Sequence, residues 1–179
     1  MPIIANAGSS AFIPCPAGPQ QAVAIDVIDL GLMKNELFPN ADGTAKWQHK
    51  IDIVWQSADL MDDGRPYLIK KRYTLSLGEK ATLRHDLASW RGRDFTPAEL
   101  EAFDVEKLIG VNAIINVAHK KGSRGGTFAN VVSVMPLMKN QTKILGVDYV
   151  RVCDRPKPDD APTHDADERP MDDDEPPPF

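Results

Sequence analysis

Apolar and polar residues alternate along three early segments of the chain, and this alternation predicts three β-strands. In the first segment Val23, Ile25 and Val27 fall on one face, and a period of two with β-branched residues is typical of a strand. A turn containing Asp63-Gly64 separates the second segment from the third and favours a hairpin. The predicted strands are residues 21–33, 46–57 and 67–77.

The hydrophobic period then changes to that of a helix. Leu83, Leu87 and Trp90 are spaced i, i+4 and i+7, which places them on one apolar stripe. We therefore predict a helix over residues 79–90 with these three side chains in the core. Thr96, with proline directly after it, predicts the start of a second, short helix.

Strand-like alternation returns in residues 111–119 and 127–135, and residues 144–152 read as one further edge strand or an interface segment. Three strands, a helical insert and two strands is the order of the OB fold, a five-stranded, partly open barrel that binds oligonucleotides. A five-stranded sheet with a helix packed on one side would have the same order. We predict a mainly β protein with an OB-fold barrel over residues 20–152.

The net charge of −5 conceals a division of the chain into two parts. Residues 151–179 hold ten Asp or Glu and four Arg or Lys, a balance of −6, which leaves +1 for residues 1–150. Residues 108–147 contain no acidic residue at all, so one edge of the body is expected to be positive. Two further segments are predicted from composition: an extended N-terminal arm over residues 1–19 and a disordered acidic tail over residues 153–179.

Predicted strands two and three and the loop 120–126 together offer the chemistry that single-stranded nucleic acid requires. Cations follow the phosphate backbone, and flat aromatic rings stack on the bases. The predicted single-stranded-DNA-binding residues are Trp47, Lys50, Tyr67, Lys70, Arg72, Tyr73, Lys120, Lys121 and Arg124. A core position is the alternative for the aromatic residues of this set, and an ordinary solvated face is the alternative for the cations of strand three.

The last nine residues, MDDDEPPPF, form an acidic run that ends in a single aromatic residue. They resemble the acidic tip of bacterial and phage single-stranded-DNA-binding proteins, in which an Asp-rich run closes on Pro-Phe and recruits replication and repair proteins. Pro176 and Pro177 depart from that pattern, because an aliphatic residue and further acid are usual there. The resemblance implies the partner-binding residues Asp172, Asp173, Asp174, Glu175, Pro178 and Phe179. An acidic tail kept for solubility is the alternative.

The sequence favours a binding protein over an enzyme, and it indicates no cofactor and no metal. The four histidines are scattered, and neither a phosphate-cradling glycine loop nor a nucleophile elbow is present. Asp59, Asp62 and Asp63 are typical of a turn. Cys15 and Cys153 lie near the two ends without metal or redox spacing, which favours a cytoplasmic protein, in the bacterial host cell if a phage encodes it. We expect neither a signal peptide nor a membrane span.

The combined expectation is a protein that coats single-stranded DNA in replication, recombination or repair. Similarity of residues 79–96 to uncharacterised phage proteins favours a bacteriophage setting. Two alternatives remain open: an adaptor that mimics a host tail without binding nucleic acid, and an RNA-binding chaperone. The apolar residues 144–152 also leave a homodimer open.

Overall fold

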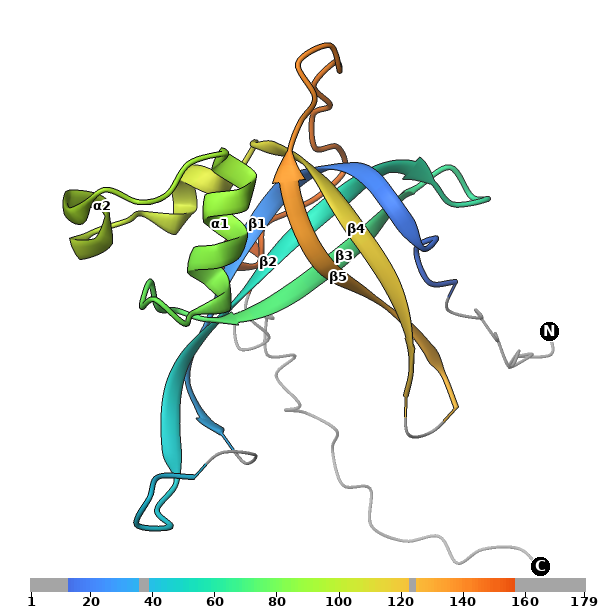
Figure 1. Cartoon of the computed structure of the whole chain (residues 1–179). Coiled ribbons are helices and arrows are strands. Elements are labelled where there is room, and N and C mark those ends of the chain that lie inside the picture. Colours follow the sequence, from blue (N-terminus) through green and yellow to red (C-terminus); the bar gives the residue numbers. More distant parts are fainter. Residues whose placement is uncertain (1–12, 36–38, 123–124, 157–179) are drawn as a thin grey trace, which may run out of the picture.

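The computed structural model describes residues 13–35, 39–122 and 125–156, and its main feature is one curled antiparallel sheet (Figure 1). The strands are β1 (Gly18–Asn35), β2 (Lys46–Leu60), β3 (Pro66–Thr74), β4 (Asn112–Lys121) and β5 (Thr127–Pro136). The helical elements are α1 (Thr82–Arg91), α2 (Pro97–Glu101) and the short 3-10 helices η1 (Val105–Leu108) and η2 (Val152–Asp154). The predicted mainly β architecture, with five strands and a helical insert between the third and fourth, is confirmed.

β1 is the central strand, and its two halves have different neighbours. The sheet order is β3-β2-β1-β4-β5. Residues 18–23 of β1 pair with β4, whereas pairing with β2 continues from Ala22 to Asn35. The far ends of β1 and β2, residues 31–35 and 46–50, therefore form a two-stranded ribbon that projects from the sheet (Figure 1). We call this the β1–β2 ribbon.

The sheet curls toward a barrel without closing, because its edge strands β3 and β5 are not ladder neighbours. A lysine bridges the gap between these edges. Lys71 Nζ on β3 donates to Asp86 Oδ2 on α1 at 2.6 Å and to the Val132 carbonyl on β5 at 3.4 Å. The hydroxyl of Tyr73 donates to the same Asp86 oxygen at 2.7 Å. Side chains thus join the two edges where a closed barrel would have a backbone ladder.

The main core lies between the inner face of the sheet and α1. Leu83, Leu87 and Trp90 of α1 are buried, as their spacing predicted. Trp55 of β2 is fully buried, and its ring centroid lies 6.0 Å from that of Trp90. Burial of each large apolar side chain contributes about 1.5–3 kcal/mol. This core fixes α1 against β3 and β5.

Helix ends follow the signals in the sequence. The hydroxyl of Thr96 accepts the N–H of Glu99, and the Glu99 carboxylate accepts the N–H of Thr96 at 2.9 Å, which forms a capping box at the start of α2. α1 ends at Gly92, whose φ of 68° is left-handed and favours glycine.

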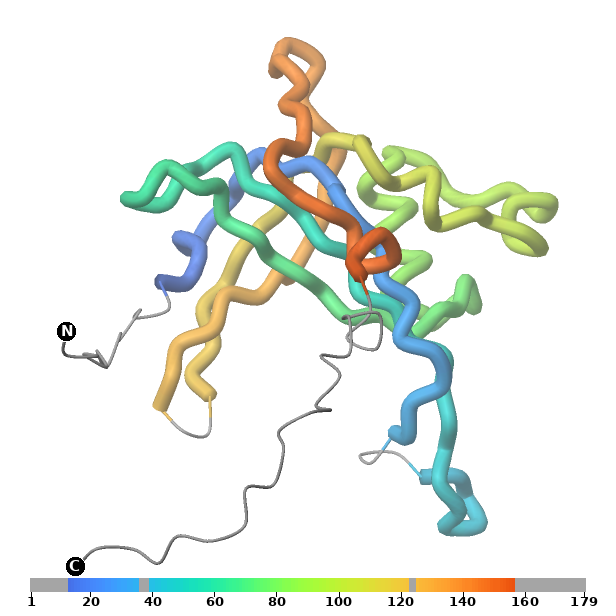
Figure 2. Tube along the Cα trace, turned by 180° about the vertical axis from the view of Figure 1, so that it is seen from behind, coloured from blue at the N-terminus to red at the C-terminus, as the bar shows by residue number. Residues whose placement is uncertain are grey.

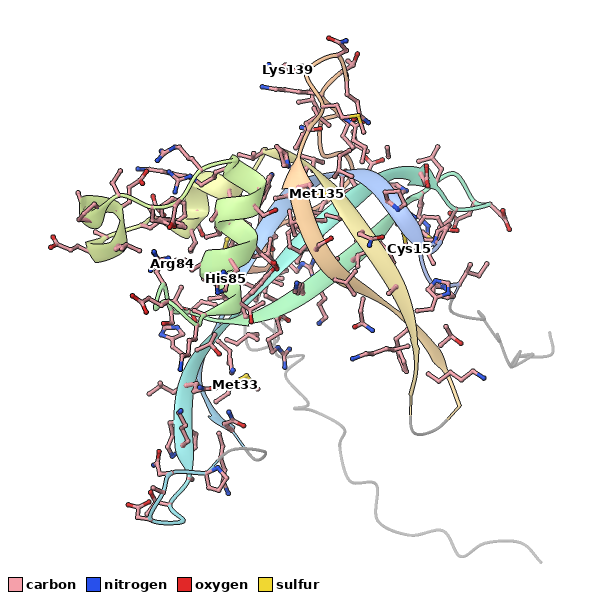
Figure 3. The ribbon with its side chains drawn as sticks, in the orientation of Figure 1. Cys15, Met33, Arg84, His85, Met135 and Lys139 are labelled. Carbon is pink, nitrogen blue, oxygen red and sulfur yellow. The ribbon has the colours of Figure 1, made fainter. Side chains whose placement is uncertain are left out.

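The sheet begins inside the segment predicted as an N-terminal arm. Residues 1–12 lie outside the described part, but β1 starts at Gly18. Cys15 is buried in the main core and lies beside β1 (Figure 3), where its thiol donates to Gln20 Oε1 at 3.0 Å. Burial raises the pKa of this thiol, so Cys15 belongs to the folded body.

Residues 141–152 cross the outer face of β1 as an irregular segment, which we call the strap (Figure 2). Of the two interpretations of residues 144–152, the further edge strand is not found. Side-chain amides take the place of a ladder: Asn112 bonds both backbone groups of Ile144 at 2.9 Å, and Gln56 bonds those of Val147 at 2.6 and 2.8 Å. These bidentate contacts satisfy backbone groups that a paired strand would otherwise have to satisfy.

A buried carboxylate holds the end of the strap. Asp26 is 1% exposed and accepts hydrogen bonds from the Tyr149 hydroxyl at 3.0 Å, Arg151 Nε at 3.1 Å and the Val152 N–H at 2.9 Å. Burial alone would raise its pKa, but these hydrogen bonds and the positive charge of Arg151 hold the pKa of Asp26 below its usual range. The ionised form of Asp26 therefore stabilises the strap.

Candidate nucleic-acid interface

The outer face of β2 and β3 carries the three cations that the sequence predicted for these strands. Ile51, Ile53 and Trp55 of β2 point into the core, so the alternate residues of that strand point outward. Lys50 on β2 and Lys70 and Arg72 on β3 all lie on this outer side, next to one another in the sheet register. The structure thus brings these three predicted residues together.

A buried acid orders two of these cations. Asp52 is 2% exposed and accepts Arg72 Nε at 2.8 Å and Arg72 Nη2 at 3.0 Å, while Lys70 Nζ lies 3.6 Å from it. The Arg72 hydrogen bonds hold the pKa of Asp52 below its usual range, although burial opposes them. Both cationic side chains remain about half exposed or more. One acid among two cations leaves the face positive.

Lys50 lies on this outer face and also lines an open groove of about 830 Å³. Its ammonium group donates to Thr74 Oγ1 at 2.6 Å and to Gln48 Oε1 at 2.8 Å. The groove lies between the β1–β2 ribbon and the residues that join β3 to α1. Its charged lining residues are Lys46, Lys50, Arg72, Lys80 and Glu79. Four cations against one acid suit a polyanion.

Lys46 and Lys80 were not singled out in the sequence. Lys46 and Lys50 are an even number of residues apart on one strand, so the period of two already places both on one face. No such local signal exists for Lys80, because it reaches the groove from the loop before α1.

The predicted aromatic residues do not share this face. Trp47 is 60% exposed, but it lies on the opposite side of the β1–β2 ribbon from Lys46 and Lys50. Tyr67 is half-buried and packs against the main core. Tyr73 lies at the groove but is only 3% exposed, so its ring offers no free face for a base to stack on. It points inward with Ile69 of the same strand.

The β4–β5 hairpin carries the remaining predicted cations. Lys120 and Lys121 are exposed at its end, whereas Arg124 lies outside the described residues. Phe128, which the sequence analysis did not single out, is 53% exposed and lies opposite Lys120 in the register. The β4–β5 hairpin and the β1–β2 ribbon project toward the same end of the molecule in both views (Figures 1 and 2).

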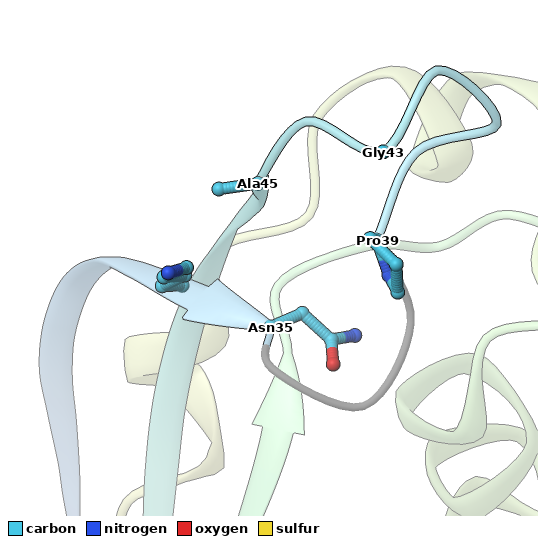
Figure 4. Close-up of a pocket in the computed structure, with 5 residues that line it drawn as sticks. Asn35, Pro39, Gly43 and Ala45 are labelled. Atoms are coloured by element: carbon cyan, nitrogen blue, oxygen red, sulfur yellow. The ribbon is translucent and has the colours of Figure 1, made fainter.

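A smaller hollow of about 350 Å³ lies at the end of the β1–β2 ribbon (Figure 4). It is lined by Lys34, Asn35, Pro39, Gly43 and Ala45. Among the described residues this lining has one cation and small or uncharged neighbours, so they provide no converging set of charged groups. The wider groove beside Lys50 is the better candidate for a polyanion.

The described residues were searched for metal-binding groups and for membrane-spanning helices. Within residues 13–35, 39–122 and 125–156 no group of three or more His, Cys, Asp or Glu is placed to hold a metal ion. In the same ranges no helix has the length and hydropathy to cross a bilayer. The predicted partner-binding residues 172–175, 178 and 179 lie outside the described part of the chain.

No protein-family model and no curated protein matches this chain.

Proposed function

We propose that this protein binds single-stranded DNA without sequence selection along the outer face of β2 and β3. The row of cations on that face carries the proposal. Lys50, Lys70 and Arg72 lie side by side there, and the groove extends the row to Lys46 and Lys80. Phosphates bound along this row release counterions, and the affinity falls as salt rises. Most of the interaction is with the backbone, so the base sequence matters little.

We further propose that the curled sheet is a partly open OB fold. The central position of β1 between β2 and β4 and the helix between β3 and β4 support this assignment. OB folds bind oligonucleotides on the β2–β3 face, between the loops that follow β1 and β4. Lys50, Lys70 and Arg72 lie on that face, and a projecting hairpin stands at each of the two loops.

The acidic end of the chain has a separate role in this proposal, in DNA replication, recombination or repair. The acidic segment ending in Phe179 offers one aromatic anchor and a negative charge that steers it to a basic partner surface. Replication or repair proteins are the expected partners.

Fluorescence anisotropy of a labelled oligo-dT, titrated at two salt concentrations, tests the binding function. We expect salt-sensitive binding with a slope of log K against log salt of about −0.7 per phosphate contacted. Duplex DNA of equal length should compete poorly. An oligo-U competitor distinguishes the RNA-binding alternative, since a ribose preference requires contacts to the 2′-hydroxyl.

Absence of binding at low salt would contradict the proposal, provided that a variant lacking residues 172–179 also fails to bind. That variant is needed because an acidic tail can itself compete for the cationic face. In that case the adaptor alternative would replace single-strand binding.

A further inference from the structure

Phe128 is an exposed aromatic side chain that rests on glycine backbone. A Cβ atom added to Gly122 would lie 3.2 Å from Phe128 Cδ2, a tight contact, and 2.5 Å from Cε2, which is closer than such atoms approach. The ring therefore occupies space that any other residue at position 122 would fill. The hairpin closes here, with the N–H of Gly122 donating to the Gly126 carbonyl at 2.7 Å. Gly122 thus makes a seat for the ring.

The seat leaves much of the ring in solvent. Phe128 is 53% exposed, so about half of its surface stays available to a ligand. Lys120 lies directly opposite Phe128 in the β4–β5 register, so both side chains are on one face of the hairpin. A flat ring beside a cation is the combination that binds a base and its phosphate.

We infer that Phe128 is a stacking platform for an unpaired base, with Lys120 beside it for the adjacent phosphate and Gly122 as the residue that positions the ring. This inference rests on the proposed single-strand binding. It identifies Phe128 as the residue by which the protein distinguishes an unpaired base from a paired one. A base inside a duplex has both faces covered by its neighbours, whereas a base in a single strand can offer one face to the ring.

The first test replaces the ring. Phe128→Leu keeps an apolar side chain but removes the flat face, and we expect oligo-dT affinity to fall about fivefold to a hundredfold. Phe128→Trp should retain affinity and add an indole whose fluorescence is quenched when oligo-dT binds, measured as the difference from the unsubstituted protein. Residual duplex binding should change little in either variant.

The second test moves the ring without removing it. Gly122→Ala forces the ring off its seat and should weaken oligo-dT binding about as much as Phe128→Leu. Gly126→Ala is the matched control, because its Cβ would meet the ring at 3.6 Å, an ordinary contact. Neither glycine has a left-handed φ, so alanine brings no backbone strain at either position. Gly126→Ala should bind as the unsubstituted protein does.

The possible results separate this inference from the function on which it rests. If the unsubstituted protein binds oligo-dT and Phe128→Leu binds equally well, the stacking role is overturned and single-strand binding stands. An equal loss of duplex and single-strand affinity in Phe128→Leu would also overturn the inference, because a stacking site acts on unpaired bases. If the unsubstituted protein does not bind at all, the proposed function fails together with the inference. Thermal melting of each variant shows whether it is folded, and Phe128→Leu remains informative if Gly122→Ala is not.

Discussion

Two neighbouring parts of the outer sheet face each contain a buried acid, and they use it in opposite ways. Asp26 on β1 and Asp52 on β2 are 1% and 2% exposed, and each is bonded to an arginine. The partners of Asp26 come from the strap, so the carboxylate fastens the chain across β1. The partners of Asp52 come from β3 within the sheet, and their cationic ends remain at the surface.

This difference divides the outer face into a closed half and an open half. The closed half has its own small core, in which Val23, Ile25 and Val54 pack with Ile144 and Tyr149 of the strap. The open half has cations, a groove and no covering segment among the described residues. A charge that fastens the chain is expected to affect stability, whereas charges left at the surface are expected to affect binding.

The largest effect should come from Asp26→Asn. The carboxylate of Asp26 accepts hydrogen bonds from Tyr149, Arg151 and Val152, and a neutral amide accepts them more weakly. Arg151 keeps its ion pair with Glu106, so we expect the cost, about 3 kcal/mol of unfolding free energy, to come from the weakened hydrogen bonds. Asp52→Asn is the matched control, and its cost should be about 1 kcal/mol because Arg72 stays half exposed and can turn to water. Urea unfolding measures both values. Equal losses in the two variants would contradict the division into a fastening acid and a surface-ordering acid.

Lowering the pH should remove the stability that ionised Asp26 contributes, without any substitution. The pKa of Asp26 is lowered in the folded state, so its ionised form favours folding. The stability that it adds is present above the unfolded-state pKa of about 3.9 and is lost as the pH falls through the folded-state value. Asp26→Asn should therefore lose less stability in that range than the unsubstituted protein.

The next effect concerns the open half. The double variant Lys50→Ala, Lys70→Ala removes one half-buried and one exposed cation and keeps the Arg72–Asp52 pair, so no buried acid is left alone. We expect oligo-dT affinity at low salt to fall at least about tenfold and the salt slope to decrease by about 0.7 for each lost contact. Anisotropy titrations at several salt concentrations measure both quantities.

Lys139→Ala, Lys143→Ala is the matched double variant for this test. Lys139 lies at the opposite end of the molecule from the projecting ribbon and hairpin (Figure 3), and Lys143 is an exposed residue of the strap. Both pairs change the net charge equally. If the two double variants weaken binding to the same degree, general charge and not the β2–β3 face attracts the nucleic acid.

Local periodicity predicted much of the fold, because the groups that decide it are close in sequence. The stripe Leu83, Leu87, Trp90 and the capping box at Thr96 lie within single helices. The strap was not predictable in this way. Its backbone groups are hydrogen-bonded by side chains such as Gln56, which is 91 residues from Val147. No sequence pattern within the strap indicates a partner so far away.

In the candidate site, too, local sequence patterns predicted some side-chain positions and not those that depend on distant backbone. The period of two already separated Lys50 from Trp47 and grouped Tyr73 with the buried Ile69, so the burial of Tyr73 was within reach of the sequence. The seat of Phe128 was not, because it depends on the path of the backbone at Gly122 across the hairpin. Glycines near an aromatic residue are common in loops and indicate no packing by themselves.

Deleting the acidic end of the chain is expected to change oligo-dT affinity least. Residues 151–179 carry a balance of −6, and the last described part of them, around η2, is held to the outer face through Asp26. Acidic residues tethered near a cationic face compete with DNA phosphates at an effective concentration set by the tether. Deleting residues 172–179 should therefore tighten oligo-dT binding about twofold to fivefold at low salt and leave it unchanged at high salt.

Phe179→Ala separates this competition from the recruitment of partners. The substitution keeps every acidic residue, so oligo-dT affinity should equal that of the unsubstituted protein, while capture of replication proteins by the immobilised chain should be lost with its aromatic anchor. The deletion removes both properties. If Phe179→Ala still captures the same proteins as the full chain, the aromatic end is not the anchor. If the deletion leaves DNA affinity unchanged at low salt, the acidic residues do not reach the open half of the outer face.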